Sequence, residues 1–295
     1  MNKIGVNPIS WSNDDLQYVG GNIPLETCLS EAAAAGFAGV ELGHKFPRDP
    51  ARLKPVLEAH GLELVSGWYS GELLSRDARA ELRSIAGHVE LLNSMACDVL
   101  IFAEVTACIH SNKYARLSQR PRMNSAQWSS FGKRLSEVAK SVAGRGLKLC
   151  YHHHMGTVVQ SKEDIDALMN ETSEEVFLLL DSGHALFAGA DPVSLAQTYA
   201  PRIGHVHCKD IRHGVMKAAL NRDGSFLDAV LDGVFTVPGD GCIDYDPLFS
   251  ALSRVGYEGW FVVEAEQDPS VAPPSYFAEL GANKLRASLA RAFPA

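Results

Sequence analysis

Short apolar runs recur along the chain, and several of them end abruptly in a histidine or a carboxylate. The clearest lies at residues 176–184, where Val-Phe-Leu-Leu-Leu is followed by Asp181, Ser182, Gly183 and His184. A short, uninterrupted apolar run is typical of a strand that is buried on both faces in a parallel sheet. The acid at its end fits two roles, a functional site or the cap of a following helix.

Three other runs change from apolar to polar in the same way. They are residues 147–155, which reach His152, His153 and His154; residues 203–210, which contain His205, His207, Lys209 and Asp210; and residues 260–268, which contain Glu264. From His152 to Asp181 and on to His207 each interval is roughly thirty residues, the length of one strand–loop–helix–loop unit. The interval from His207 to Glu264 is about twice as long, so we expect an insertion at residues 211–241.

Four further strands are predicted in the first part of the chain, at residues 4–7, 39–42, 62–67 and 99–103. Helical spacing of apolar positions predicts a helix after each strand. These helices run from Pro24 to Gly36, over residues 50–60, 78–95 and 125–143, onward from Ser161, and over residues 192–199, 244–255 and 274–293. Eight strands that alternate with helices predict an α/β fold, a (β/α)8 TIM barrel that forms a single domain over residues 1–295.

The expected insertion after strand 7 has a pattern of its own. Residues 215–220 and 225–231 predict two short helices, with Ser225 as a cap and Gly233 as a stop. We expect the insertion to bury Phe226, Leu227 and Phe235. A lid over the site and a subunit contact in a homo-oligomer fit this pattern equally well.

Residues 107–124 contain few apolar side chains and predict a surface loop over the barrel mouth. We expect the basic side chains of this loop to be solvated rather than to bind substrate. They are His110, Lys113, Arg116, Arg120 and Arg122.

Length and composition agree with a single barrel and exclude some partners. The chain has 295 residues, of which 46% are hydrophobic, and a formal net charge of −8. An acidic chain argues against nucleic acid or an anionic membrane as the main partner. We find no signal peptide and no bilayer-length apolar run, and the six cysteines form no Cys-x-x-Cys pair, so we expect a soluble protein in a reducing cytoplasm.

Function in such barrels lies at the carboxyl ends of the strands, where these histidines and acids fall. One histidine alone is more often a core or surface residue, but four matched strand ends favour a site for a divalent cation such as Mn, Co, Zn or Fe. Strand alternation puts His152 and His154 on one side, and His205 and His207 on one side. The choice of ligand within each pair stays open at this point.

Several strings resemble known proteins. Asp181-Ser-Gly-His184, His205-Val-His207-Cys-Lys-Asp210 and Val-Val-Glu264 resemble the xylose isomerase-like barrel superfamily of sugar isomerases and epimerases. Two further stretches are similar, more narrowly, to the inosose dehydratase family. They are Tyr151-His-His-His-Met-Gly-Thr157 and Phe235-Thr-Val-Pro-Gly-Asp-Gly241.

The resemblance implies four metal ligands, His152, Asp181, His207 and Glu264. It also implies Co or Mn as the metal and a requirement for glutathione. The chain departs from the isomerases at one ligand, because His152 stands where they usually have glutamate. Losing that carboxylate weakens a symmetrical proton exchange between the two faces of a substrate.

The implied reaction is the loss of water from 2-keto-myo-inositol (scyllo-inosose), a polyol ketone, which gives a trihydroxycyclohexane-1,2-dione in myo-inositol catabolism. A base removes the proton beside the ketone, and an acid assists the departing hydroxyl. The sequence does not rank the candidates for these roles. They are Glu41, His154, His184 and Lys209, with Lys209 and Arg212 also suited to hold substrate hydroxyls or to form a solvated pair.

Three rival functions differ in what they predict. An inosose or sugar isomerase or epimerase would use the same metal site without losing water. A non-catalytic sugar-binding barrel would take up no metal and turn nothing over. Phosphodiester cleavage at DNA lesions fits poorly, because the chain is acidic and lacks ligands for three metals.

Overall fold

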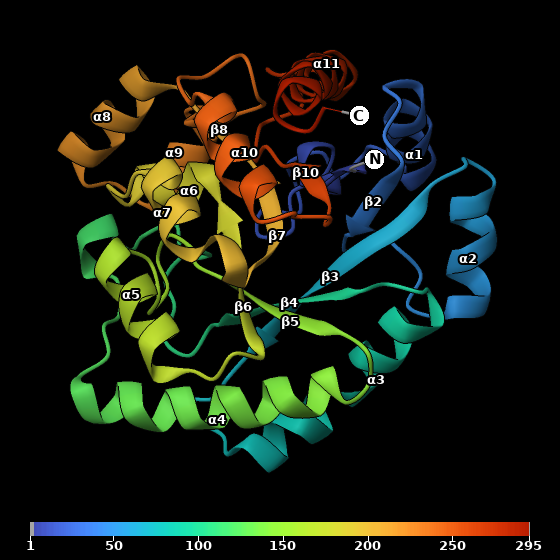
Figure 1. Cartoon of the computed structure of the whole chain (residues 1–295). Helices are drawn as coiled ribbons and strands as arrows, with labels where there is room; N and C mark the ends of the chain where they lie inside the picture. Colours follow the sequence, from blue (N-terminus) through green and yellow to red (C-terminus); the bar gives the residue numbers. More distant parts are fainter. Residues whose placement is uncertain (1–2, 295) are drawn as a thin grey trace.

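A computed structural model describes residues 3–294, and its eight parallel strands close into a barrel in the order β1-β10-β7-β6-β5-β4-β3-β2 (Figure 1). The barrel closes because β1 pairs with β10 on one side and with β2 on the other. The predicted TIM barrel is therefore confirmed. The strands are β1 (Ile4–Val6), β2 (Gly39–Leu42), β3 (Glu63–Gly71), β4 (Val99–Glu104), β5 (Lys148–His152), β6 (Val176–Asp181), β7 (Ile203–Cys208) and β10 (Phe261–Val263).

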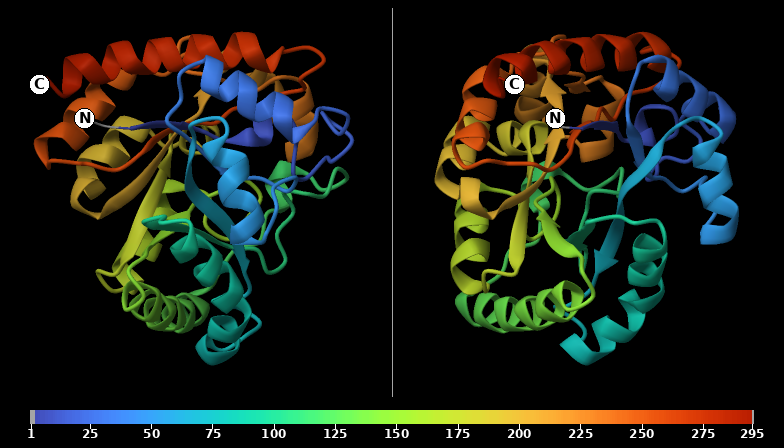
Figure 2. Two further views of the ribbon diagram at one scale, coloured as in Figure 1. Left: turned by 90° about the vertical axis from the view of Figure 1, so that its right-hand side faces the viewer. Right: turned by 45° about the vertical axis from the view of Figure 1, so that its right-hand side comes forward.

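Helices surround the barrel and bury their apolar faces against it, with α4 and α11 on opposite sides (Figure 2). Several of these helices begin at residues whose side chains cap the first turn. Asp49, which precedes Pro50 at the start of α2, accepts a hydrogen bond from the Ala51 amide. At the start of α5, Ser161 and Asp164 form a capping box. The outer helices are α1 (Leu25–Ala34), α2 (Pro50–Glu58), α3 (Ala78–Ser94), α4 (Ser125–Ala143), α5 (Lys162–Glu171), α7 (Pro192–Tyr199), α10 (Tyr245–Arg254) and α11 (Pro274–Ala292).

Two elements of the barrel differ from the sequence-based expectation. Strand β3 continues to Gly71, past the predicted end at residue 67, because its last residues still pair with β4. An unpredicted helix, α6 (Ser182–Phe187), follows β6 directly. Six residues are too short a window for helical periodicity to be recognised.

The segment between β7 and α10 forms two helices and a two-stranded antiparallel ribbon. Figure 1 shows α8 at the periphery and α9 next to α6. Phe226, Leu227 and Phe235 are buried, as predicted, and Ser225 caps α9. The elements are β8 (Asp210–Ile211), α8 (His213–Arg222), α9 (Phe226–Leu231) and β9 (Phe235–Thr236).

The sequence predicts that the basic side chains of residues 107–124 are solvated. This is wrong for Arg120 and only partly true of His110. Arg120 is buried and pairs with Asp164 at 2.7 Å, and His110 is largely buried. The loop turns inward because Leu117 packs with the inserted segment and its amide bonds to the Gly224 carbonyl at 2.9 Å. The expectation holds for Lys113, Arg116 and Arg122, which are exposed.

All six cysteines are free thiols, as the absence of paired motifs predicts. Within residues 3–294, none of the helices is long and apolar enough to cross a membrane.

Candidate active site

Four side chains from four barrel strands meet at the carboxyl end of the barrel. One ligand atom from each of His152, Asp181, His207 and Glu264 lies within 4.8 Å of those of the others, and all four side chains are buried. Within residues 3–294, three of these atoms have no hydrogen-bond partner outside the cluster: Asp181 Oδ2, His207 Nδ1 and Glu264 Oε2, of which the last two are in direct contact with each other. Buried polar atoms without partners are costly, and a cation shared among them would satisfy all three. The residues present therefore fit a divalent cation.

Hydrogen bonds outside this cluster set the tautomers of its two imidazoles. His152 Nδ1 lies 2.6 Å from the His153 carbonyl, and His207 Nε2 lies 3.1 Å from Glu41 Oε1. Each of these nitrogens is placed to donate to its oxygen, so the other ring nitrogen has a lone pair when the ring is neutral. Those nitrogens, His152 Nε2 and His207 Nδ1, are the ones that face the cluster, which is the usual arrangement around histidines that bind metal. Burial lowers the pKa of His207, but the carboxylates of Glu264 and Glu41 outweigh it and raise the pKa well above its ordinary value, so the neutral ring of His207 is the form that a bound cation would select.

Asp181 performs both roles that the sequence left open. Its Oδ1 accepts a hydrogen bond from the His184 amide at 2.8 Å and caps α6. Its Oδ2 lies 3.6 Å from His152 Nε2 and 3.5 Å from His207 Nδ1. The cap fixes the carboxylate, so that its second oxygen points into the cluster.

Glu41, a candidate for proton transfer, is instead saturated with hydrogen bonds. Besides His207, it accepts from Asn7 Nδ2 at 2.7 Å, Ser66 Oγ at 2.6 Å and His205 Nε2 at 2.9 Å. Burial favours the neutral form, but His207 and His205 outweigh it and hold the pKa of Glu41 well below its ordinary value. A carboxylate whose oxygens accept four hydrogen bonds orients its neighbours and has little free capacity to accept a proton from a substrate.

We expect Glu41→Gln to weaken metal binding by about 10- to 100-fold, as is usual when the partner of a ligating histidine is lost. The amide keeps the size of the side chain but loses its negative charge, and its NH2 group would face a donor, either Asn7 Nδ2 or the histidines. Metal affinity, measured by competition with a chelating dye, checks this. The control is Glu104→Gln, since Glu104 is also buried at a strand end but bonds only to the amides of Leu73 and Thr106 and to no histidine. Equal affinity in wild type and Glu41→Gln would contradict the expectation.

A second buried cluster, of His154, His184, Lys209 and Glu266, adjoins the first. Lys209 Nζ donates to Glu266 Oε1 at 2.7 Å and to His184 Nε2 at 2.9 Å, and it lies 3.5 Å from Glu264 Oε1. Burial lowers the pKa of Lys209, but the carboxylates of Glu264, Glu266 and Asp181 outweigh it and raise the pKa above its ordinary value. Lys209 is fully buried, so the alternative of a solvated pair is wrong for it.

Gly183 makes room for this lysine. A Cβ atom on residue 183 would lie 2.6 Å from Lys209 Cγ, which is closer than real Cβ contacts. The glycine of the Asp-Ser-Gly-His string is therefore required for the packing of Lys209, and hence for the contact between the two clusters.

The two histidines of the second cluster, His154 and His184, differ in which ring nitrogens have hydrogen-bond partners. His184 Nε2 accepts from Lys209, and its Nδ1 faces the Met155 amide at 3.3 Å. His154 Nδ1 donates to the Met155 carbonyl at 2.8 Å, and His154 lines the cavity above the clusters. Burial and the neighbouring His184 and His110 hold the pKa of His154 well below its ordinary value, so its ring is neutral at pH 7.

A cavity of about 240 Å³ opens above both clusters. His152, His207 and Glu264 lie in its wall together with His154 and Glu266, and Trp68 borders it on β3. The Trp68 ring meets the rings of His152 and His154 edge-on, at centroid distances of 5.3 and 5.9 Å. A pocket that combines an aromatic face with convergent polar groups suits a small polyhydroxylated ring.

The inserted segment covers the second cluster with aromatic side chains. The Phe226 ring lies 5.2 Å from that of His154 and 5.8 Å from that of His184, and Lys209 Nζ lies 4.5 Å from the centre of the Phe235 ring. These apolar covers keep solvent away from His184 and Lys209.

Arg212 is used within the insertion itself and does not line the cavity. It donates to the Gly233 carbonyl at 2.8 Å, to Thr236 Oγ1 at 3.0 Å and to Asp240 Oδ2 at 2.7 Å. Arg212 therefore links the end of β8 to β9 and to the turn that follows β9.

Sequence reasoning did not identify several residues of the cavity wall as site residues, among them Asp15, His110, Trp68 and Glu266. Asp15 and His110 come from loops, where no strand pattern marks a site residue. Trp68 lies within β3, two residues after Ser66, and Glu266 follows the end of β10, two residues after Glu264. The period of two in extended chain would have indicated the same side as Ser66 and Glu264, respectively.

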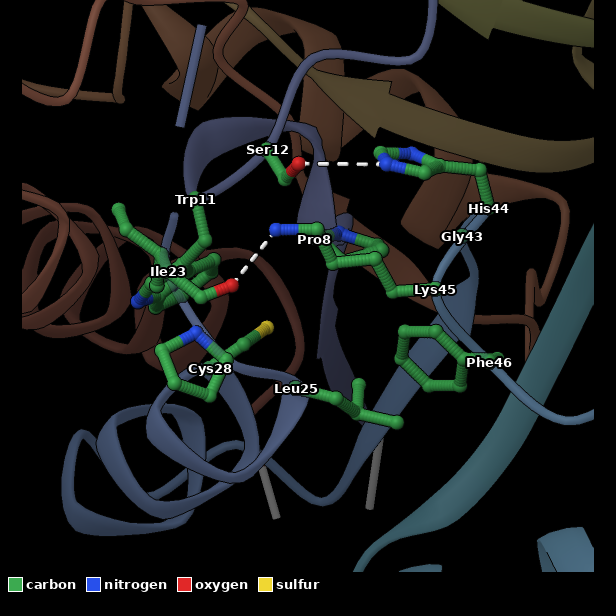
Figure 3. A pocket seen from close by; sticks show the side chains of 11 residues that line it. Pro8, Trp11, Ser12, Ile23, Leu25, Cys28, Gly43, His44, Lys45 and Phe46 are labelled. Carbon is green, nitrogen blue, oxygen red and sulfur yellow. Dashed lines mark hydrogen bonds between the residues drawn. The ribbon is translucent and has the colours of Figure 1, made fainter. Parts of the chain in front are cut away.

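Beside the cavity, the turn after β2 anchors the loop between β1 and α1. Lys45, whose neighbour Phe46 packs near Pro8, donates to the carbonyl of Ile23 at 2.6 Å (Figure 3) and to that of Gly20 at 2.9 Å. Its ammonium group is thus committed to holding the backbone of this loop.

A closed parallel barrel with buried imidazoles and carboxylates at the carboxyl ends of its strands defines the chain as a TIM barrel with an enzyme-type site. The xylose isomerase-like TIM barrel family matches residues 29–288, and the chain belongs to this family.

Its curated relatives cover nearly the whole chain. The chain is 48% identical to the rhizopine catabolism protein MocC of Rhizobium meliloti, over 96% of this chain and 87% of that protein. It is 42% identical to an inosose dehydratase of Geobacillus thermodenitrificans, over 94% of this chain and 93% of that protein. Among solved structures, the IOLI protein with a bound zinc atom shares the fold, with a TM-score of 0.71 and 16% identity over 99% of this chain and all of that one.

Proposed function

We propose that this chain catalyses the metal-dependent dehydration of 2-keto-myo-inositol to a trihydroxycyclohexane-1,2-dione. The observation that carries the proposal is 42% identity with an inosose dehydratase along 94% of the chain.

His152, Asp181, His207 and Glu264 would hold the cation. A mixed set of two imidazole nitrogens and two carboxylate oxygens suits a first-row divalent ion, and we propose Mn or Co. Such an ion supplies a Lewis acid that polarises the ketone and stabilises negative charge on its oxygen. The glutathione requirement that the family resemblance implies stays a prediction, which assays with and without reduced glutathione would test.

We assign His154 as the base that removes the proton beside the ketone. The sequence offers four candidates for proton transfer, and His154 is the histidine among them that borders the cavity. Its Nδ1 donates to the Met155 carbonyl, and its Nε2 has no hydrogen-bond partner among residues 3–294. Lys209 and His184 are positioning residues, because their polar atoms bond to each other and to Glu266. Lys209 also places a buried positive charge next to the cluster, which favours the enolate form of a substrate.

The test is the product formed from scyllo-inosose. Dehydration lowers the mass of the product by one water and creates an enolised dione with ultraviolet absorbance, and we expect both. An isomerase or epimerase on the same site would retain the mass of the six-carbon polyol. Unchanged mass with rearranged stereochemistry would therefore favour that alternative and overturn the proposal.

A role in rhizopine catabolism is a second candidate, favoured by the 48% identity with MocC. Growth of a deletion strain separates the two. Loss of growth on rhizopine with normal growth on myo-inositol would assign the chain to the rhizopine route.

We further propose that the insertion, residues 211–241, acts as a lid. Phe226→Leu should lower turnover about tenfold, because small displacements of positioned groups are costly in catalysis, while metal affinity stays nearly unchanged. The reason is that Phe226 touches His154 and His184 but none of the four proposed ligands.

Steady-state kinetics and metal titration on the same Phe226→Leu preparation check the lid. Leu231→Ala, a change at a half-exposed position of the same helix α9, is the control. Unchanged turnover with an altered association state would make the insertion a subunit interface instead.

A further inference from the structure

Asp15 lies in the wall of the cavity on a loop that is held firmly in place. The side chain of Asn13 accepts hydrogen bonds from the amides of Asp15 at 2.9 Å and Leu16 at 2.7 Å, which fixes the backbone at Asp15. The same cavity wall contains His152, His207 and Glu264. A carboxylate is thus fixed in the same pocket as the proposed metal ligands but on a different element.

The neighbouring acid, Asp14, is committed to holding this loop. Its Oδ1 lies 2.5 Å from His44 Nδ1 and 3.3 Å from the His44 amide, and His44 Nε2 lies 3.3 Å from Ser12 Oγ (Figure 3 shows this last bond). Together with the bonds of Lys45 to Gly20 and Ile23, they tie the β1–α1 loop to the turn after β2. The two adjacent acids therefore have different tasks.

Unlike the carboxylate of Asp14, that of Asp15 is not used in hydrogen bonds that hold the loop. Within residues 3–294 it accepts no hydrogen bond, and it faces His110, whose Nε2 lies 3.8 Å from Asp15 Oδ1. The His110 ring lies 5.1 Å from that of His154, and its Nδ1 is buried without a partner.

The backbone at residue 156 fixes His110 in this position. Gly156 has φ +79°, and a Cβ atom there would lie 2.9 Å from the His110 amide nitrogen. The Ile109 amide also donates to the Gly156 carbonyl at 2.8 Å. The glycine after the three histidines thus lets the loop carrying His110 approach the strand end that carries His154.

We propose that Asp15 is a further catalytic residue, the acid that protonates the departing hydroxyl, and that His110 positions it. This inference rests on the proposed dehydration. The base takes the proton from carbon, the C–H electron pair becomes the new C=C bond, and the C–O bond breaks. The oxygen leaves with the C–O electron pair, takes the proton of Asp15 and departs as water. Asp15 is left as a carboxylate and recovers a proton from solvent, so nothing is oxidised or reduced.

The electrostatics of the cavity support an acid at this position. Burial, followed by the negative charges of Glu266 and Asp14, raises the pKa of Asp15 to about 7, while Lys209 opposes the shift. The carboxyl is protonated below that pH and ionised above it. An acid with this pKa loses activity as the pH rises through about 7. The other titratable groups that face it are His110 and the thiol of Cys108.

The experiment compares the pH dependence of kcat for wild type, Asp15→Asn and Asp15→Glu acting on scyllo-inosose. Wild type should lose activity as the pH rises through about 7. Asp15→Asn should lower kcat about 100-fold, the usual contribution of one positioned acid, and abolish that pH limb. Asp15→Glu should restore part of the rate and recover a limb at a shifted pH. The control Asp49→Asn removes the same charge at the N-cap of α2 and should keep the wild-type profile.

The outcomes separate the two proposals. If wild type releases no water from scyllo-inosose, the proposed function fails, and the role of Asp15 in that reaction fails with it. If wild type is active and Asp15→Asn keeps both its rate and its pH limb, only the assignment of Asp15 is overturned. A higher KM with unchanged kcat would also overturn it, since Asp15 would then merely bind a substrate hydroxyl. Retained metal content in Asp15→Asn excludes misfolding as the cause of a loss.

Discussion

Asp181→Asn is expected to abolish tight metal binding and to lower kcat by at least about a thousandfold, equivalent to about 4 kcal/mol of barrier. The substitution is nearly isosteric. The amide oxygen can still accept from the His184 amide and cap α6, so the helix should form. What is lost is the charged Oδ2, which has no hydrogen-bond partner and faces His152 and His207.

Metal content of the purified variant and its turnover are the two measurements. Asp191→Asn is the matched control, because Asp191 caps α7 through the amides of Val193 and Ser194 and lies on the surface. It should cost at most about 1 kcal/mol of stability and leave both readouts unchanged. Full metal occupancy in Asp181→Asn would remove Asp181 from the ligand set.

The same residue illustrates how far the sequence leads. An apolar run that ends in an acid places Asp181 at the carboxyl end of a buried strand, and that placement is confirmed. The sequence could not decide between a cap and a functional group, because both need a carboxylate at the same position. The two oxygens divide these tasks, which only coordinates can reveal.

Glu41 and Arg212 mark a second limit. Glu41 receives its hydrogen bonds from residues as far along the chain as His205 and His207, and no local pattern encodes such a network. Arg212 lies at a strand exit like the other candidates, yet its guanidinium turns toward Gly233 and Asp240 because the insertion folds back beside it. Periodicity predicts which face of a strand a residue occupies but not its distant partners.

Loops mark a third limit. Asp15 and His110 border the cavity, but their segments have neither helical nor strand periodicity to predict a direction. A cluster of basic residues normally indicates a solvated loop, and that average expectation hid His110 and Arg120. The Gly156 contact that brings His110 inward depends on packing between two segments distant in sequence.

His152→Glu is expected to retain some metal but to lower dehydration at least about a hundredfold, since it alters the charge that stabilises the enolate. As a proposed ligand, His152 would bind the cation as a neutral group, so glutamate would make the site more negative by one unit, next to Asp181 Oδ2 at 3.6 Å. The new carboxylate also provides a second proton acceptor in the cavity, near the edge of Trp68. We therefore expect slow exchange of the carbon-bound proton with solvent, the behaviour of an epimerase.

Water loss and deuterium incorporation, measured in the same His152→Glu preparation, decide the role of this histidine. His152→Gln is the control, because it removes the imidazole without adding a charge and should lose dehydration without gaining exchange. The wild-type side chain is fixed by its bond to the His153 carbonyl, so neither variant disturbs a partner that another side chain needs. Dehydration at the wild-type rate in His152→Glu would show that the neutral ligand is tolerated rather than required, and that the chemistry does not depend on the charge at this position.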